Sequence, residues 1–216
     1  MHGRISFVLL TVLVLASSQI STAVSAQQVM LLGDLNTERW SGTIGGNVVQ
    51  AYTRIQVSEP IVIQSVSMYL QYAGSDGSQC MMFGVYRDNG AGSPAGEPLV
   101  ATTRTAYCLH GTSSWGPAWQ RWSLLPSDYL QISSPGTYWL CTLAKQTYGY
   151  IFHYGWSGSS AYDYRYGYAT YYFYWPFNHE FPSVFSNTPT AEYYGPYSFY
   201  VAGSTSPHWV QTCPMC

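Results

Sequence analysis

The sequence predicts an all-β fold of antiparallel strands, a β-sandwich or a barrel. About ten short segments rich in Val, Ile, Tyr, Thr and Trp are separated by clusters of Gly, Pro, Ser and Asn, a pattern typical of strands joined by turns. Helical periodicity is nearly absent, and a single helical turn is expected at Pro126–Leu130. No repeat of about 20–50 residues is visible, which disfavours a solenoid or a propeller.

The expected strands run along the chain from residue 29 onward, and no linker divides them into two domains. We therefore expect one domain over residues 27–216, long enough to bury a sizeable core. The expected strands are Val29–Gly33, Val48–Val57, Ile61–Tyr72, Cys80–Arg87, Leu99–Thr105, Trp119–Leu124, Gly136–Ala144, Tyr150–Tyr154, Tyr162–Tyr174 and Tyr197–Ala202.

The segment Ile61–Tyr72 shows how one strand divides its side chains between two faces. Strand side chains repeat every two residues, so the odd-numbered isoleucines and serines share one face. Val66, Met68 and Leu70 share the other, which is the expected core face near the end of the strand. Further along, Asn89-Gly90 tolerates positive φ and predicts a chain reversal.

Residues 1–26 have the pattern of a secretory signal peptide. One positive charge precedes an apolar run of about a dozen residues from Ile5, and Ala23–Ala26 has the small-x-small pattern of a signal-peptidase site. A membrane span needs roughly 20 apolar residues, so this run is short, and no later stretch is long enough. We expect cleavage after Ala26 and a secreted or cell-surface protein, with a retained N-terminal anchor as the alternative.

The chain carries very little charge. Charged residues make up 8% of it, against about 25% in an ordinary soluble domain, and Lys145 is its one lysine. Without a basic stripe to neutralise phosphates, nucleic-acid binding is disfavoured. Solubility must depend on Ser, Thr, Gln, Asn and the Tyr hydroxyls, a surface suited to an extracellular environment.

Five cysteines cannot all pair within one chain, although an exported protein can keep disulfides. Cys80 and Cys108 flank an expected hairpin, and pairing across it would bring their Cα atoms within disulfide reach. Cys141 lies in an apolar run and is expected to be a buried free thiol. Cys213 and Cys216 form a CxxC with no helix to follow, which favours a local disulfide or a bridge to another chain over a redox or zinc site.

The richest aromatic segment covers residues 148–175 and holds ten tyrosines. Four of them, from residue 162 to residue 168, alternate strictly and must share one face of any strand built there. With two tryptophans they are the candidate platform for stacking a sugar ring. The rings could instead pack the core, the commoner outcome for any single tyrosine, and the face on which Asp163 and Arg165 lie decides between the two interpretations. The candidate platform residues are Trp156, Tyr162, Tyr164, Tyr166, Tyr168 and Trp175.

Several strand and turn motifs follow one another in a characteristic order. They are Gly33–Asn36, Ile61–Leu70, Gly84–Gly90, Gly92–Pro94, Leu99–Thr103, Gly136–Leu140, Phe181–Pro182 and Tyr197–Val201. This order resembles that of jelly-roll β-sandwich modules in secreted prokaryotic proteins, of the anchor-domain and carbohydrate-binding-module-like type. The resemblance implies an exported two-sheet jelly roll, usually non-catalytic and found at cell surfaces, and it implies no particular binding residues.

Two glutamates are the candidate pair for a glycoside hydrolase. Such an enzyme needs two carboxylates facing each other about 5–9.5 Å apart, and Glu180 and Glu192 both lie beside aromatic residues. Small jelly-roll xylanases, which have a similar length and aromatic content, carry one of their glutamates on a mid-chain strand. This chain has no matching residue, so loop positions are the simpler interpretation.

No cofactor is expected from the sequence, with one possible exception. Asp88 and Asn89 could offer oxygen ligands to a structural calcium ion, although a plain turn explains the same residues. The four histidines after residue 26 have no metal-binding spacing, so no transition metal is expected.

We therefore expect a secreted or cell-surface, non-enzymatic module that binds a polysaccharide or a surface protein through an aromatic face. The first alternative is a structural subunit that self-assembles through uncharged edge strands and the terminal cysteines. The second is a small jelly-roll glycoside hydrolase.

Overall fold

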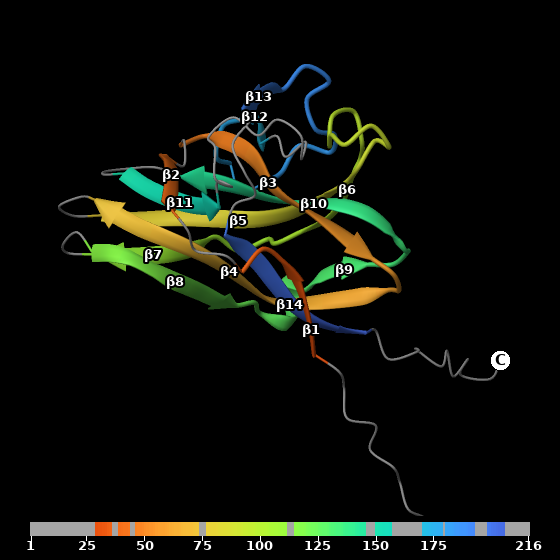
Figure 1. The fold of residues 1–216 in the computed structure, drawn as a ribbon, viewed down its shortest axis with the longest axis horizontal. Helices are drawn as coiled ribbons and strands as arrows, with labels where there is room; N and C mark the ends of the chain where they lie inside the picture. Colours follow the sequence, from red (N-terminus) through yellow and green to blue (C-terminus); the bar gives the residue numbers. More distant parts are fainter. Residues whose placement is uncertain are drawn as a thin grey trace, which may run out of the picture.

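The structure, a computed structural model, confirms the predicted fold class. It describes residues 29–35, 39–43, 46–73, 77–111, 115–145, 150–156, 170–178, 180–192 and 198–205. Two antiparallel sheets pack face to face, and the chain passes repeatedly from one sheet to the other (Figure 1). The predicted signal peptide (residues 1–26) lies outside the described residues, as do Tyr162, Tyr164, Tyr166, Tyr168, Cys213 and Cys216.

One sheet, sheet A, is built around the long strand β4 (Ile61–Ala73). Met68 pairs with β8 on one side and with β14 on the other, so the partners of β4 lie along both of its edges. One edge holds β8 (Trp115–Ser123) and β9 (Leu130–Ile132), and the other holds β14 (Phe199–Thr205) and β11 (Tyr150–Trp156). Beyond these last two lie β1 (Val29–Gly33) and β2 (Arg39–Thr43).

Sheet B places the strand β10 between β3 and β5. Its order is β13 (Thr190–Glu192), β12 (Thr170–Tyr174), β3 (Val48–Val57), β10 (Gly136–Lys145) and β5 (Gly77–Arg87). The outer edge of β5 is shared by β6 (Leu99–Thr102) and β7 (Tyr107–Gly111). The predicted helical turn is the 3-10 helix η1 (Pro126–Asp128).

The core between the sheets contains apolar residues of β4 that simple alternation assigns to opposite faces of the strand. Val66, Met68 and Leu70 are buried as predicted, but so are Ile61 and Ile63. The pairing with β14 slips at residue 64, where an extra residue forms a β-bulge. Since a bulge shifts the alternation by one residue, it turns the odd-numbered isoleucines and the even-numbered later residues toward the same core.

A second, smaller core lies on the outer face of sheet B. The segment after β12 folds back over this face, and Phe181 and Phe185 cover Tyr86 and Trp139. The bulge of β3 at Tyr52 allows that strand to serve both cores, with Val49 facing outward and Ile55 facing sheet A. Sheet B is therefore packed on both faces.

Most predicted strands are present, and the differences are local. The predicted strand Leu99–Thr105 ends at Thr102, because the Thr103 hydroxyl accepts the Phe83 N–H and the chain then turns away toward Asp128. Four short strands were not predicted: β2, β7, β9 and β13. Among the described residues, no helix is long and apolar enough to cross a membrane.

Candidate functional site

The predicted aromatic platform lies mostly outside the described residues. Trp156 is the last residue of β11, and its side chain is not among those described. Trp175 directly follows β12 and is half-buried against the second core. Its indole N–H donates to the carbonyl oxygen of Glu180 at 3.1 Å, so this N–H is engaged within the fold.

Three other aromatic side chains meet on the outer face of sheet A, the face turned away from the core. Tyr69 of β4 lies opposite Trp119 of β8, with ring centroids 5.5 Å apart. Tyr200 of β14 approaches from the other side of β4, and its ring centroid is 4.9 Å from that of Trp119. All three side chains are half-buried. They are hereafter the aromatic triad.

The local sequence of β4 makes room for the triad. Ser67 pairs with Tyr200 on one side and with Arg121 on the other, so a small side chain lies where the large rings converge. Its hydroxyl is fully buried and has no hydrogen-bond partner among the described residues. Beside it, a guanidinium nitrogen of the exposed Arg121 donates to the Ser65 hydroxyl at 3.3 Å.

This arrangement combines ring surfaces with hydrogen-bond donors. Aromatic rings offer apolar faces, and the Tyr hydroxyls, the indole N–H and Arg121 provide polar atoms at the same place. Sequence reasoning missed this face, although the alternation of β4 places Tyr69 and the serines opposite the core residues. Register could not be read from sequence, so the approach of Trp119 and Tyr200 was not foreseen.

Asp88 and Asn89, the candidate calcium ligands, organise a turn. Asp88 Oδ1 accepts the N–H groups of Gly90 and Gly92 at 2.8 and 3.3 Å. Its Oδ2 accepts the indole N–H of Trp139 at 2.8 Å and forms an ion pair with Arg54 at 3.1 Å. Both carboxylate oxygens therefore face N–H donors and a cation, an arrangement that fits a turn and does not fit a calcium ion.

The Asn89 side chain completes this turn. Its Oδ1 accepts the N–H groups of Ala91 and Ser93 at 2.8 and 3.3 Å. Gly90 and Gly92 both have φ of 83°, in the left-handed region that favours glycine. The predicted chain reversal at Asn89-Gly90 is confirmed.

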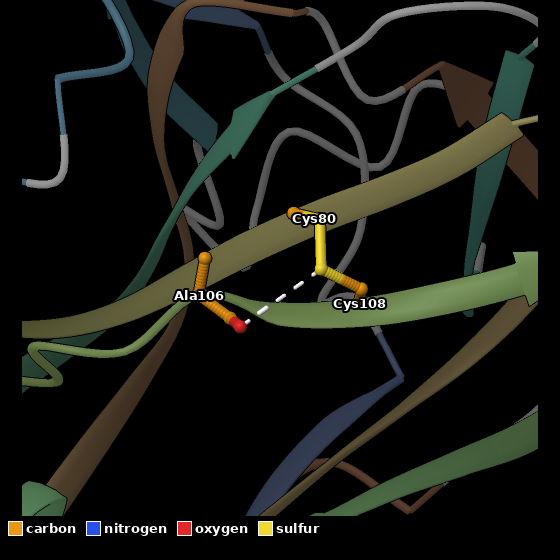
Figure 2. The surroundings of a disulfide bond; sticks show 3 residues. All are labelled: Cys80, Ala106 and Cys108. Atoms are coloured by element: carbon orange, nitrogen blue, oxygen red, sulfur yellow. Dashed lines mark hydrogen bonds between the residues drawn. A yellow bond between two sulfur atoms is a disulfide. The ribbon is translucent and has the colours of Figure 1, made fainter.

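The predicted disulfide between Cys80 and Cys108 is also confirmed. The two residues lie directly opposite each other on β5 and β7, and their Cα atoms are 3.9 Å apart. Figure 2 shows the sulfur–sulfur bond spanning the two neighbouring strands, with the Cys108 sulfur 3.9 Å from the carbonyl oxygen of Ala106. The bond holds β7 against the edge of β5.

Asp128 is a buried carboxylate at the end of η1, and its hydrogen bonds connect η1 to the loop between β6 and β7. Its Oδ1 accepts the backbone N–H of Arg104, and its Oδ2 accepts the hydroxyl proton of Tyr107, each at 2.9 Å. Burial opposes its ionisation, but these bonds and one from the Thr105 side chain outweigh burial and hold the pKa of Asp128 below its usual value. Burial raises the pKa of Tyr107 to about 12.

Cys141 is the buried free thiol that the sequence predicts. Burial raises its pKa well above the usual value, so the nucleophilic thiolate is disfavoured. The nearby Tyr86 is also buried, which raises the pKa of its phenol, and its hydroxyl donates to the Pro182 carbonyl at 2.7 Å. Both residues act in packing.

The two candidate catalytic glutamates lie on the chain after β12. Glu180 is exposed in the segment between β12 and β13, and Glu192 ends β13 with a side chain that is not among those described. Within the described residues, no group of three or more His, Cys, Asp or Glu side chains is placed to hold a metal ion.

No protein-family model matches this chain, and no curated protein sequence shows significant similarity to it.

Proposed function

We propose that this protein is an exported, non-enzymatic module that binds a glycan through the outer face of sheet A. The observation that carries the proposal is the aromatic triad, three half-buried rings in contact on a sheet face turned away from the core. A sugar ring presents C–H groups to such rings and hydroxyls to neighbouring polar side chains. Arg121, exposed beside the triad, is the nearest charged donor on this face.

The ring geometry favours one kind of glycan over another. The Trp119 ring is inclined at 59° to Tyr69 and at 66° to Tyr200, so the triad is angled rather than flat. A crystalline polysaccharide surface needs coplanar rings, whereas an angled set of rings fits a single sugar unit of a soluble chain. The glycan of this proposal is therefore soluble and not crystalline.

The cysteines support export. Disulfides persist in oxidising compartments and are rare in the cytosol, and Cys80–Cys108 is a cross-strand disulfide. With the signal-like residues 1–26, this favours a secreted or surface-exposed protein. N-terminal sequencing of the exported protein is expected to begin at Gln27, and a first residue within the apolar run would contradict cleavage after Ala26.

Affinity gel electrophoresis with a panel of soluble polysaccharides tests glycan binding. At least one polysaccharide is expected to retard the wild-type protein. Trp119→Ala removes the central ring and is expected to weaken that binding about tenfold, equivalent to about 1.4 kcal/mol.

Tyr174→Ala is the matched control, because Tyr174 is an aromatic residue that is 70% exposed on a different sheet. It is expected to leave binding unchanged. Binding of no polysaccharide, or an equal loss in both variants, would overturn the proposal.

An exposed apolar edge favours self-association as a second candidate function. Among the described strands, β14 is the one ladder partner of β1, and Val29 and Leu31 on β1 are 69% and 55% exposed. An unpaired, apolar strand edge is a template for strand addition. Light scattering should show Leu31→Lys reducing any concentration-dependent dimer, whereas Leu125→Lys, at an exposed leucine outside the strands, should not. A wild-type protein that stays monomeric at high concentration would remove this candidate.

A further inference from the structure

A groove of about 460 Å³ lies on the opposite side of the molecule from the aromatic triad. Its walls include the Cys80–Cys108 disulfide, Ala106, Phe177, Arg104 and Lys145. Along β5, Met81 points into the core between the sheets, and Met82 points to the outer face, where it packs in the second core. Cys80 is two residues before Met82 and therefore lies on the same outer face. The groove therefore opens on the outer face of sheet B, beside the covering segment.

Two cations line this groove in a chain that has few. Arg54 is paired with Asp88, Arg87 donates to Ser134 and Tyr138, and Arg121 donates to Ser65. Within the described residues, by contrast, neither the Arg104 guanidinium nor the Lys145 ammonium has a hydrogen-bonded or ion-paired partner. Both side chains are exposed.

The nearest buried carboxylate does not neutralise this pair. Asp128 accepts the backbone N–H of Arg104 and the hydroxyl of Tyr107, so its oxygens are directed at the loop and not at the guanidinium. The Arg104 side chain is free to present its planar set of donors to another anion, and Lys145 adds a second positive charge.

The rest of the groove is apolar and held in place. Phe177 is half-buried against the second core, and its backbone N–H donates to Asn47 Oδ1 at 3.0 Å. The disulfide fixes β7 against β5, and Lys145 pairs with Cys80 on the other side of β5. Lys145 is thus carried on a strand of the linked β10–β5–β7 set, Arg104 lies in the loop before β7 that Asp128 holds, and Phe177 lies on an anchored segment.

We propose that this groove binds an acidic sugar, with its carboxylate or sulfate group between Arg104 and Lys145 and its ring against Phe177. The oxyanion satisfies the two cations, and the aromatic ring provides the apolar contact that a free inorganic ion cannot use. The site is distinct from the aromatic triad and does not depend on the function proposed for that face.

Titration calorimetry at low ionic strength tests the proposal with four probes: D-glucuronate, glucose 6-sulfate, glucose and inorganic sulfate. At least one of the two acidic sugars is expected to bind at least tenfold more tightly than glucose and than inorganic sulfate. Whichever of the two binds more tightly identifies the preferred oxyanion. Raising the NaCl concentration to 0.5 M is expected to weaken binding, because partly exposed charges are screened.

Arg104→Gln and Lys145→Gln are each expected to weaken binding of the acidic sugar about tenfold. Arg121→Gln makes the same change in net charge on the opposite face and is expected to leave it unchanged, as is Trp119→Ala. The far-ultraviolet circular dichroism of each variant establishes that it is folded.

Failure of both acidic sugars to bind tenfold more tightly than glucose and inorganic sulfate, or an equal loss of binding in Arg121→Gln, would overturn this site. A loss of binding in Arg121→Gln would place the acidic sugar on the outer face of sheet A instead, whereas the other outcome leaves polysaccharide binding by the aromatic triad to its own test, Trp119→Ala.

Discussion

The indole N–H of Trp139 donates to Oδ2 of Asp88 at 2.8 Å, linking a buried strand of sheet B to the turn between β5 and β6. Trp139 is 1% exposed and Asp88 is 8% exposed, so the contact is shielded from water. The same carboxylate pairs with Arg54 and caps the N–H groups of the turn. One side chain thus connects the second core to the chain reversal.

Asp88→Asn is expected to destabilise the protein by about 2 kcal/mol. An amide has one acceptor oxygen, whereas both oxygens of Asp88 accept N–H groups, and the amide N–H₂ would face another donor. Urea unfolding followed by tryptophan fluorescence measures the loss. Glu59→Gln, at an exposed carboxylate, should stay within about 0.5 kcal/mol of wild type. Equal effects of the two substitutions would show that the contacts of Asp88 do not stabilise the fold.

Asp128→Asn is expected to lower stability in a pH-dependent way. Hydrogen bonds hold the folded-state pKa of Asp128 below its usual value, so its contribution is complete above the unfolded-state pKa of about 3.9 and is lost as pH falls through the folded-state value. The gap between wild type and variant, about 2 kcal/mol at pH 7, should narrow as the pH approaches 2. Denaturant unfolding at several pH values checks this, and a gap independent of pH would contradict it.

Removal of the Cys80–Cys108 disulfide is expected to cost about 3.5 kcal/mol, because the bond closes a loop with a sequence separation of 28. The double variant Cys80→Ser/Cys108→Ser should melt at a lower temperature than the oxidised wild type. Addition of a reductant should lower the Tm of the wild type and leave the double variant unaffected. A reductant effect of equal size in both proteins would place the sensitive bond elsewhere.

Gly203→Ala is expected to destabilise the fold by at least about 2 kcal/mol. A Cβ at this position would lie 2.5 Å from the Val62 carbonyl oxygen, beside the bulge where β14 pairs with β4. Gly116→Ala is the matched control, since a Cβ there would meet no atom within 4 Å. Thermal unfolding of the two variants should differ clearly, and equal melting temperatures would show that the backbone at the bulge adapts freely.

Ser67→Ala is expected to leave stability unchanged or to raise it slightly. The hydroxyl is buried beneath the aromatic triad without a hydrogen-bond partner among the described residues, so its removal takes away an uncompensated polar group. Chemical denaturation measures the effect. A loss above about 1 kcal/mol would show that the hydroxyl makes a stabilising hydrogen bond.

The fold class was predictable because its signals are local. Runs of β-branched, aromatic and other apolar residues between turn residues indicated β3, β4, β5 and β10, and Asn89-Gly90 indicated the reversal after β5. The short strands β2, β7, β9 and β13 have three to five residues each, too few for an alternation to stand out. The bulge at residue 64 was also missed, since a shift in alternation becomes visible only through pairing with β14.

The two candidate sites were not predictable, because they depend on register and on the covering segment. Tyr69, Trp119 and Tyr200 come from three strands whose mutual pairing is not contained in any local pattern. Likewise, nothing near Lys145 in the sequence indicates that it lines a groove with Arg104 and Phe177. The long tyrosine run drew attention because it is contiguous, whereas the triad is assembled from distant positions.

The packing of sheet B on both faces makes the two broad sides of the molecule unequal. Sheet A presents the aromatic triad outward, whereas the described part of the opposite side carries the groove at the margin of the segment that folds over it. A short glycan cannot reach both sites, because the full thickness of the sandwich separates them. If both proposed sites bind glycans, a single molecule of the protein holds two separate sugar chains on opposite sides even as a monomer.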